Sequence, residues 1–185
     1  HFSTDFVFDG KKKSPYKEND ITCPINNYGL SKLRGEKEIF DFDLEKSIII
    51  RTSWLYSKFE NNFVTKIIDK LNSNKPFSVV NDEIGSPTSS LDLAMAIMIL
   101  LSKTTNQKPE IYHYSNNGYC SRYEFAKQIK KILKSDTVIK IESKINHDSF
   151  RPKFTVLNNE KIMSKFELEN LDWKSSLKNM LDGNY

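Results

Sequence analysis

The sequence predicts an α/β protein in which short strands alternate with helices along the whole chain. Two observations support this fold class. Short runs of β-branched and aromatic residues are separated by longer stretches whose apolar residues recur at helical spacing. The composition, with 38% hydrophobic and 28% charged residues in 185 positions, is that of a folded globular chain. Regular alternation of this kind is typical of a sheet with mainly parallel strands.

The predicted strands are short apolar runs bounded by turn residues. They are expected at residues 2–8, 48–50, 77–80, 111–114 and 138–141. The first should end at the turn pair Asp9-Gly10, because both residues favour turns. The second consists of three isoleucines, a composition typical of a strand that is covered on both faces.

The predicted helices carry apolar residues on one face, three and four positions apart. They are expected at residues 28–42, 61–74, 91–101, from the capping box Ser121-x-x-Glu124 to Leu133, 160–166 and 175–181. The helix at 91–101 follows Ser90 as its N-cap and is apolar nearly all round. We therefore expect this helix to be buried on every side.

Composition and charge exclude several classes of protein. The formal net charge is only +4, and the lysines are spread along the chain beside acids, so we expect no nucleic-acid partner. The longest apolar run, at 94–101, is far shorter than the roughly 20 residues that cross a membrane. Two cysteines, Cys23 and Cys120, form no C-x-x-C motif and are expected to be reduced thiols of a cytoplasmic protein.

The beginning of the sequence does not look like the start of a domain. His1 precedes what reads as the inside of a strand, and the six glycines form no phosphate-binding G-x-G-x-x-G pattern. We therefore expect that the front of a longer protein is missing. The fragment alone should bind a dinucleotide weakly or not at all, and should be inactive.

A tyrosine and a lysine lie one helical turn apart at Tyr28 and Lys32. An ammonium ion about 4 Å from a phenolate stabilises it by at most ~4 kcal/mol at an effective dielectric near 20. Such a tyrosine can donate a proton to a carbonyl oxygen. The spacing alone is not specific, because the sequence repeats it at Tyr123 and Lys127, where we interpret it as structural.

The context of Tyr28 is far more specific than the pair itself. The strand and turn Phe2-Ser3-Thr4-Asp5 precede it, and Pro24 stands four positions before it. Further motifs occur at 28–36 (YGLSKLRGE), 50–56 (IRTSWLY), 61–64 (NNFV), 79–88 (VVNDEIGSPT), 111–114 (IYHY), 151–153 (RPK) and 173–177 (WKSSL). Together these segments resemble the extended short-chain dehydrogenase/reductases, and within them the reductases of dTDP-linked 4-keto sugars.

The resemblance implies a role for each matching residue. Tyr28 corresponds to the catalytic acid, and Lys32 to its partner, which also holds the nicotinamide ribose. Thr4 corresponds to the hydroxyl that hydrogen-bonds the reacting oxygen and tunes the tyrosine. The remaining implied contacts are Thr52 and Ser53 with the nicotinamide, Asp5 and Trp54 with the sugar, and Arg151 with the nucleotide phosphates.

The resemblance also implies a fold and an activity. Residues 1–57, with 81–114 returning to them, would form the C-terminal part of a Rossmann-type doubly wound parallel sheet. Residues 58–80 and 115–185 would form a small α/β substrate-binding domain. The implied reaction is reduction of the 4-keto group of dTDP-4-dehydro-L-rhamnose by NADPH or NADH, in a protein that could form a homodimer.

Several positions depart from the family pattern or stay open. Phe6 and Ser57 replace a usual tyrosine and glycine, and the acidic residue that holds magnesium in some relatives is absent after Thr88, so no metal is expected. Asp82-Glu83 could be solvated or lie in a subunit contact, and His113 is expected to pack rather than to catalyse. Two alternative functions remain: a related nucleotide-sugar epimerase or dehydratase, and a noncatalytic subunit resembling the regulatory subunit of methionine adenosyltransferase.

Overall fold

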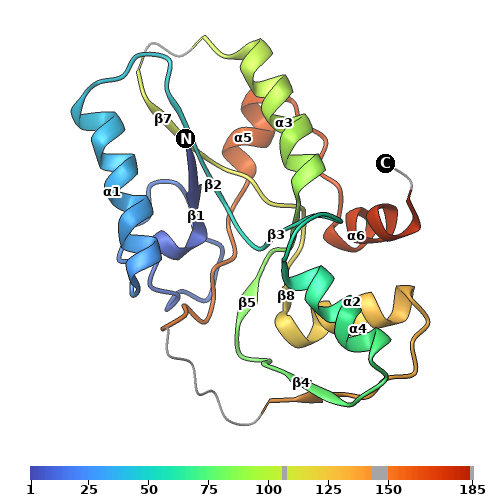
Figure 1. The fold of residues 1–185 in the computed structure, drawn as a ribbon. Coiled ribbons are helices and arrows are strands. Elements are labelled where there is room, and N and C mark those ends of the chain that lie inside the picture. Colours follow the sequence, from blue (N-terminus) through green and yellow to red (C-terminus); the bar gives the residue numbers. More distant parts are fainter. Residues whose placement is uncertain (106–107, 143–149, 184–185) are drawn as a thin grey trace.

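The computed structural model describes residues 1–105, 108–142 and 150–183. Its central sheet contains three parallel strands, β1 (Phe2–Thr4), β2 (Ile48–Thr52) and β7 (Glu110–His113), in the order β1-β2-β7. Helix α1 (Asn27–Asp41) covers one face of this sheet, and α3 (Ser90–Lys103) and α5 (Glu160–Phe166) cover the other (Figure 1). The α/β fold with a parallel sheet is therefore confirmed.

The register of the sheet brings two polar strand ends together. Thr4 at the end of β1 is paired with Thr52 at the end of β2. The residues that follow these strands, Asp5 and Ser53, are both buried. This edge is where ligands bind in open parallel α/β sheets.

Helix α1 begins where the sequence predicts it because of a side-chain cap and a close contact. The Asn26 side chain accepts a hydrogen bond from the Gly29 amide at 2.8 Å and so caps the helix. Gly29 lies directly against the main chain of Phe6, where a Cβ atom would come within 2.1 Å of the carbonyl oxygen. The contact places the first turn of α1, including Tyr28, beside the end of β1.

The rest of the chain builds a second core around Phe125. Helix α4 (Arg122–Ile132) packs on α2 (Phe63–Asn72) and α6 (Trp173–Asp182). The remaining short elements are β3 (Leu55–Tyr56), β4 (Phe77–Val79), β5 (Ile84–Gly85), β6 (Thr88–Ser89), β8 (Cys120–Ser121), β9 (Ile139–Ile141) and the 3-10 turn η1 (Asp5–Val7). They pair as β3 with β6, β4 with β9, and β5 with β8. The predicted capping box is confirmed, since Ser121 and Glu124 each accept the other's amide.

Three predictions about these elements are wrong. The N-cap of α3 is Ser89, whose hydroxyl accepts the Asp92 amide, and Ser90 is the first residue of the helix. The strand predicted at 2–8 ends at Thr4, because the Thr4 hydroxyl accepts the Phe6 amide and turns the chain into η1. Helix α3 is not buried on every side: Leu93, Ala96 and Leu100 face the sheet, whereas Met95 and Met98 are exposed. Only one stripe of an α-helix can contact a single sheet, whatever the composition of the other side.

The predicted division into two domains stays a prediction. Helix α5, assigned from the sequence to the second domain, packs its residues Ile162 and Phe166 against Tyr112 of β7 and Leu100 of α3. No helix in the described ranges is both long and apolar enough to span a bilayer.

Candidate active site

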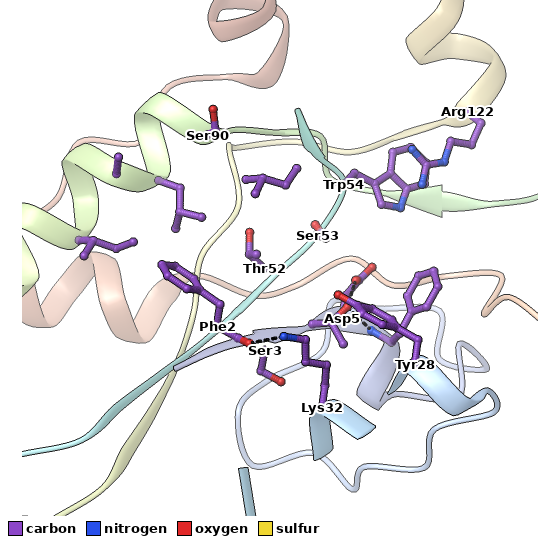
Figure 2. Close-up of a pocket in the computed structure, with 16 residues that line it drawn as sticks. Phe2, Ser3, Asp5, Tyr28, Lys32, Thr52, Ser53, Trp54, Ser90 and Arg122 are labelled. Carbon is purple, nitrogen blue, oxygen red and sulfur yellow. Dashed lines mark hydrogen bonds between the residues drawn. The ribbon is translucent and has the colours of Figure 1, made fainter. Parts of the chain in front are cut away.

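A cavity of about 440 Å³ opens at the carboxyl ends of β1 and β2. It is lined by every predicted site residue except Arg151, namely Thr4, Asp5, Tyr28, Lys32, Thr52, Ser53 and Trp54 (Figure 2). Apolar side chains of α3, among them Leu93 and Ile97, form part of its wall. The fold therefore brings together predicted site residues that the sequence separates by up to fifty positions, from Thr4 to Trp54.

The Tyr28 phenol and the Lys32 ammonium reach this cavity from the first turns of α1. The Tyr28 side chain is 54% exposed and packs edge-on against Phe6, with ring centroids 6.0 Å apart. Lys32 Nζ donates a hydrogen bond to the Phe2 carbonyl oxygen at 3.1 Å, which holds the ammonium beside β1 (Figure 2). The phenol is accessible to a ligand, and an ammonium group lines the same cavity.

Thr4 and Asp5 form a buried pair on the cavity floor. Thr4 Oγ1 donates to Asp5 Oδ1 at 3.0 Å and accepts from the Phe6 amide at 3.2 Å. Burial raises the pKa of the Asp5 carboxyl from 3.8 to about 6, against the opposing effects of hydrogen bonds from Thr155 and Thr4 and of the Arg122 charge. Asp5 is thus a carboxyl group that can gain a proton under mildly acidic conditions.

The Asp5→Asn variant should be more stable than the wild type above about pH 6. The folded protein binds the Asp5 proton more tightly than the unfolded chain, so this contribution is fully present below pH 3.8 and is lost as the pH rises through about 6. Because asparagine stays neutral, the free energy of unfolding should increase by up to about 3 kcal/mol at high pH. Urea unfolding on both sides of this range measures it, and an equal difference at low and high pH would contradict the prediction.

The two hydroxyl groups at the end of β2, on Thr52 and Ser53, differ in their hydrogen bonding. Ser53 Oγ donates to the Ser86 carbonyl oxygen at 2.7 Å. Thr52 Oγ1 is buried and has no hydrogen-bond partner within the described part of the chain. A buried hydroxyl without a partner is costly, so a ligand that supplies one would be favoured here.

The Trp54 indole forms the far wall of the cavity. Its backbone has a φ of 44°, in the left-handed region that few non-glycine residues adopt. A Cβ atom on Gly85 would come within 2.5 Å of the indole Cε2, so a side chain at position 85 would displace the ring. The Arg122 guanidinium lies 3.6 Å from the indole centroid and also lines the cavity (Figure 2).

Sequence reasoning missed Arg122, and of the two alternatives left open for Glu83, the solvated one is wrong. Glu83 is only 5% exposed and pairs with Arg122 at 3.6 Å and with Arg151 at 3.7 Å, so it is not a solvated loop residue. Its neighbour Asp82 is exposed and pairs with Lys153. The position of Arg122 next to the capping residue Ser121 gave no indication that it reaches the site.

Arg151 lies outside the cavity at the ends of β1 and β2. It lines an adjacent hollow of about 560 Å³ together with Asn26, Phe150 and Arg122. This hollow shares Phe6, Tyr28 and Arg122 with the cavity at the strand ends, so the two spaces adjoin. Contact of Arg151 with substrate phosphates stays a prediction.

His113 does not line this cavity. His113 is fully buried, and burial together with the Arg51 charge lowers its pKa to about 3. Over the described residues, no three histidine, cysteine, aspartate or glutamate side chains gather as a metal site requires.

The parallel sheet, with a tyrosine–lysine helix beside the ends of β1 and β2, defines the class: Rossmann-type folds of the short-chain dehydrogenase/reductase kind. The chain belongs to the RmlD substrate binding domain family, which matches residues 1–185.

Comparison with known proteins identifies several relatives. SpsK, a spore coat polysaccharide biosynthesis protein of Bacillus subtilis strain 168, is 38% identical over 98% of this chain and 62% of its own length. The dTDP-4-dehydrorhamnose reductase of Aggregatibacter actinomycetemcomitans is 35% identical over 97% of this chain and 65% of its own length. The chain therefore spans less than two thirds of these relatives.

Solved structures of reductases with this name also resemble the chain. A dTDP-4-dehydrorhamnose reductase from Bacillus anthracis strain Ames in complex with NADP superposes with a TM-score of 0.92 and 34% identity, over 99% of this chain and 64% of that one. A dTDP-glucose 4,6-dehydratase from the same organism is only 18% identical with a TM-score of 0.83, and shares the fold.

Proposed function

We propose that this chain forms the substrate-binding and proton-donating part of a dTDP-4-dehydrorhamnose reductase that uses NADPH or NADH. The observation that carries the proposal is the meeting of Tyr28, Lys32 and Thr4 in one cavity at the ends of β1 and β2. The family, and the relatives whose names state this activity, support the same reaction.

The residues at the strand ends fit the nicotinamide half of a dinucleotide. Thr52 Oγ1 is a buried hydroxyl in need of a partner. Lys32 Nζ has donors beyond the one given to Phe2 and could hold ribose hydroxyls. When bound, the reduced nicotinamide would supply a hydride to the ketone carbon.

Side chains of this chain would carry out the proton transfer. Tyr28 would donate its hydroxyl proton to the ketone oxygen as the alcohol forms, and the Lys32 charge would stabilise the phenolate that remains. Thr4 would orient the oxygen. Asp5 and Trp54 would contact the sugar, and Arg151, in the adjoining hollow, would meet the negatively charged diphosphate.

Two further expectations concern the whole protein. Cys23 and Cys120 are both free thiols, which favours a reducing, cytoplasmic location. A homodimer and the absence of a nucleic-acid partner are inferences from the resemblance and from the charge distribution.

The test uses the protein expressed from its complete reading frame. NADPH oxidation should depend on dTDP-4-dehydro-L-rhamnose and should yield dTDP-L-rhamnose, whereas dTDP-glucose, which has no ketone, should give no turnover. Epimerisation or water elimination without net oxidation of NADPH would indicate a sister enzyme. Absence of turnover with every 4-keto sugar, together with co-purification of another enzyme, would indicate a noncatalytic subunit.

A further inference from the structure

The Arg122 guanidinium packs over the ring of Trp54, the aromatic side chain expected to contact the sugar. The guanidinium lies 3.6 Å from the Trp54 ring centroid (Figure 2). It also lies 4.9 Å from the ring centroid of Phe63. At 3.6 Å a planar guanidinium is in van der Waals contact with the face of an indole, the arrangement in which cation–π attraction is strongest. The two side chains therefore pack as one unit in the cavity wall.

This guanidinium is anchored rather than free. Glu83, itself buried, pairs with Arg122 at 3.6 Å, and the Glu83 carbonyl oxygen accepts the Arg122 amide at 3.2 Å. Arg122 is also the first residue of α4, directly after the capping box at Ser121. The guanidinium and the backbone amide of Arg122 are thus both held by Glu83, in the segment between β4 and β5.

The Trp54 indole is held by contacts from other segments of the chain. The residue adopts a left-handed conformation, and the following residue, Leu55, is exposed. The indole lies against the Gly85 backbone, the Arg122 guanidinium and the Phe125 ring, whose centroid is 6.4 Å away in a stacked arrangement. Loss of the guanidinium would remove one of these three contacts and widen the range of orientations open to the ring.

We infer that Arg122 is a positioning residue: its planar guanidinium, anchored by Glu83, fixes the Trp54 indole as the wall against which the sugar ring of the nucleotide-sugar packs. This inference rests on the proposed function, because it assumes a sugar ring in the cavity. The flat shape of the side chain matters as well as its charge, so lysine cannot replace it.

The test compares Arg122→Lys, which keeps the charge and the pairing with Glu83, with Arg122→Met, which removes both. In the protein from the complete reading frame, each variant should raise KM for dTDP-4-dehydro-L-rhamnose about tenfold, as expected for a lost desolvated cation–π contact. The value of kcat and the KM for NADPH should stay within about twofold. The near-UV circular dichroism of the tryptophans should weaken in both variants.

Lys174→Met is the matched control, because Lys174 Nζ lies 5.6 Å from the ring of Trp173, the other tryptophan, and neither residue lines the cavity. It should leave both KM values unchanged. Turnover by the wild type with an unchanged sugar KM in Arg122→Lys would overturn the inference, as would an altered near-UV signal without a change in KM. Failure of the wild type to reduce any dTDP-linked ketone would instead contradict the proposed function.

Discussion

Replacing Tyr28 by phenylalanine is expected to lower kcat for ketone reduction by about 10²–10⁴-fold, the usual contribution of a positioned acid. The substitution removes only the hydroxyl and keeps the ring that packs edge-on against Phe6. The KM for the dTDP-sugar should therefore change little, and the loss should fall on the chemical step. Initial rates of NADPH oxidation over a range of sugar concentrations separate the two parameters.

The chain contains its own control for this experiment. Tyr123 and Lys127 have the same spacing in α4, and Lys127 Nζ lies 5.6 Å from the Tyr123 ring. Neither residue lines the cavity at the strand ends. Tyr123→Phe should therefore keep wild-type kinetics. A similar loss of kcat in both variants, or no loss in Tyr28→Phe, would show that Tyr28 is not the proton donor.

Replacing Arg51 by methionine is expected to lower the free energy of unfolding by about 3–5 kcal/mol. Arg51 donates to Glu36 through Nη2 at 2.6 Å and Nε at 2.9 Å, and both side chains are 3% exposed. The variant would leave the Glu36 carboxylate buried beside Ser3 without its cation. Urea denaturation followed by far-UV circular dichroism measures the loss.

A surface pair and a double variant provide the comparison. Lys103 and Glu167 are 3.3 Å apart but 45% and 86% exposed, so Lys103→Met should cost less than about 1 kcal/mol. Combining Arg51→Met with Glu36→Met removes both charges and should restore part of the lost stability, because no unpaired carboxylate remains. A double variant that is less stable than Arg51→Met would contradict this explanation.

Local signals in the sequence account for most of the helices and strands. The Asn26 cap, the Ser121 capping box and the isoleucines at 48–50 act through neighbours within a few positions, so they can be recognised without the fold. Strand β1 ends early because the Thr4 hydroxyl accepts a hydrogen bond from the Phe6 amide. Hydrophobic patterning does not reveal such side-chain-to-backbone hydrogen bonds.

The candidate site could likewise be predicted only in part from the sequence. Tyr28, Lys32 and the threonines at the strand ends follow from motif and topology, since parallel strands end at one edge. The contact of Arg122 with Trp54 and the buried pairing of Glu83 join segments that only the folded chain brings together. The amphipathic pattern likewise could not show that one side of α3 is exposed, because exposure depends on what packs there.

The buried imidazole of His113 lies beside Arg51, and this neighbour determines which ring nitrogen carries the proton. An arginine can only donate, so His113 Nε2, 3.4 Å from Arg51 Nη1, must be the bare nitrogen. The proton then resides on Nδ1, which donates to the Tyr16 carbonyl oxygen at 3.1 Å. A single tautomer thus connects the loop ahead of α1 to the sheet, and this link should persist unchanged over the range in which ordinary imidazoles titrate. Nitrogen-15 chemical shifts of the ring would display that tautomer directly.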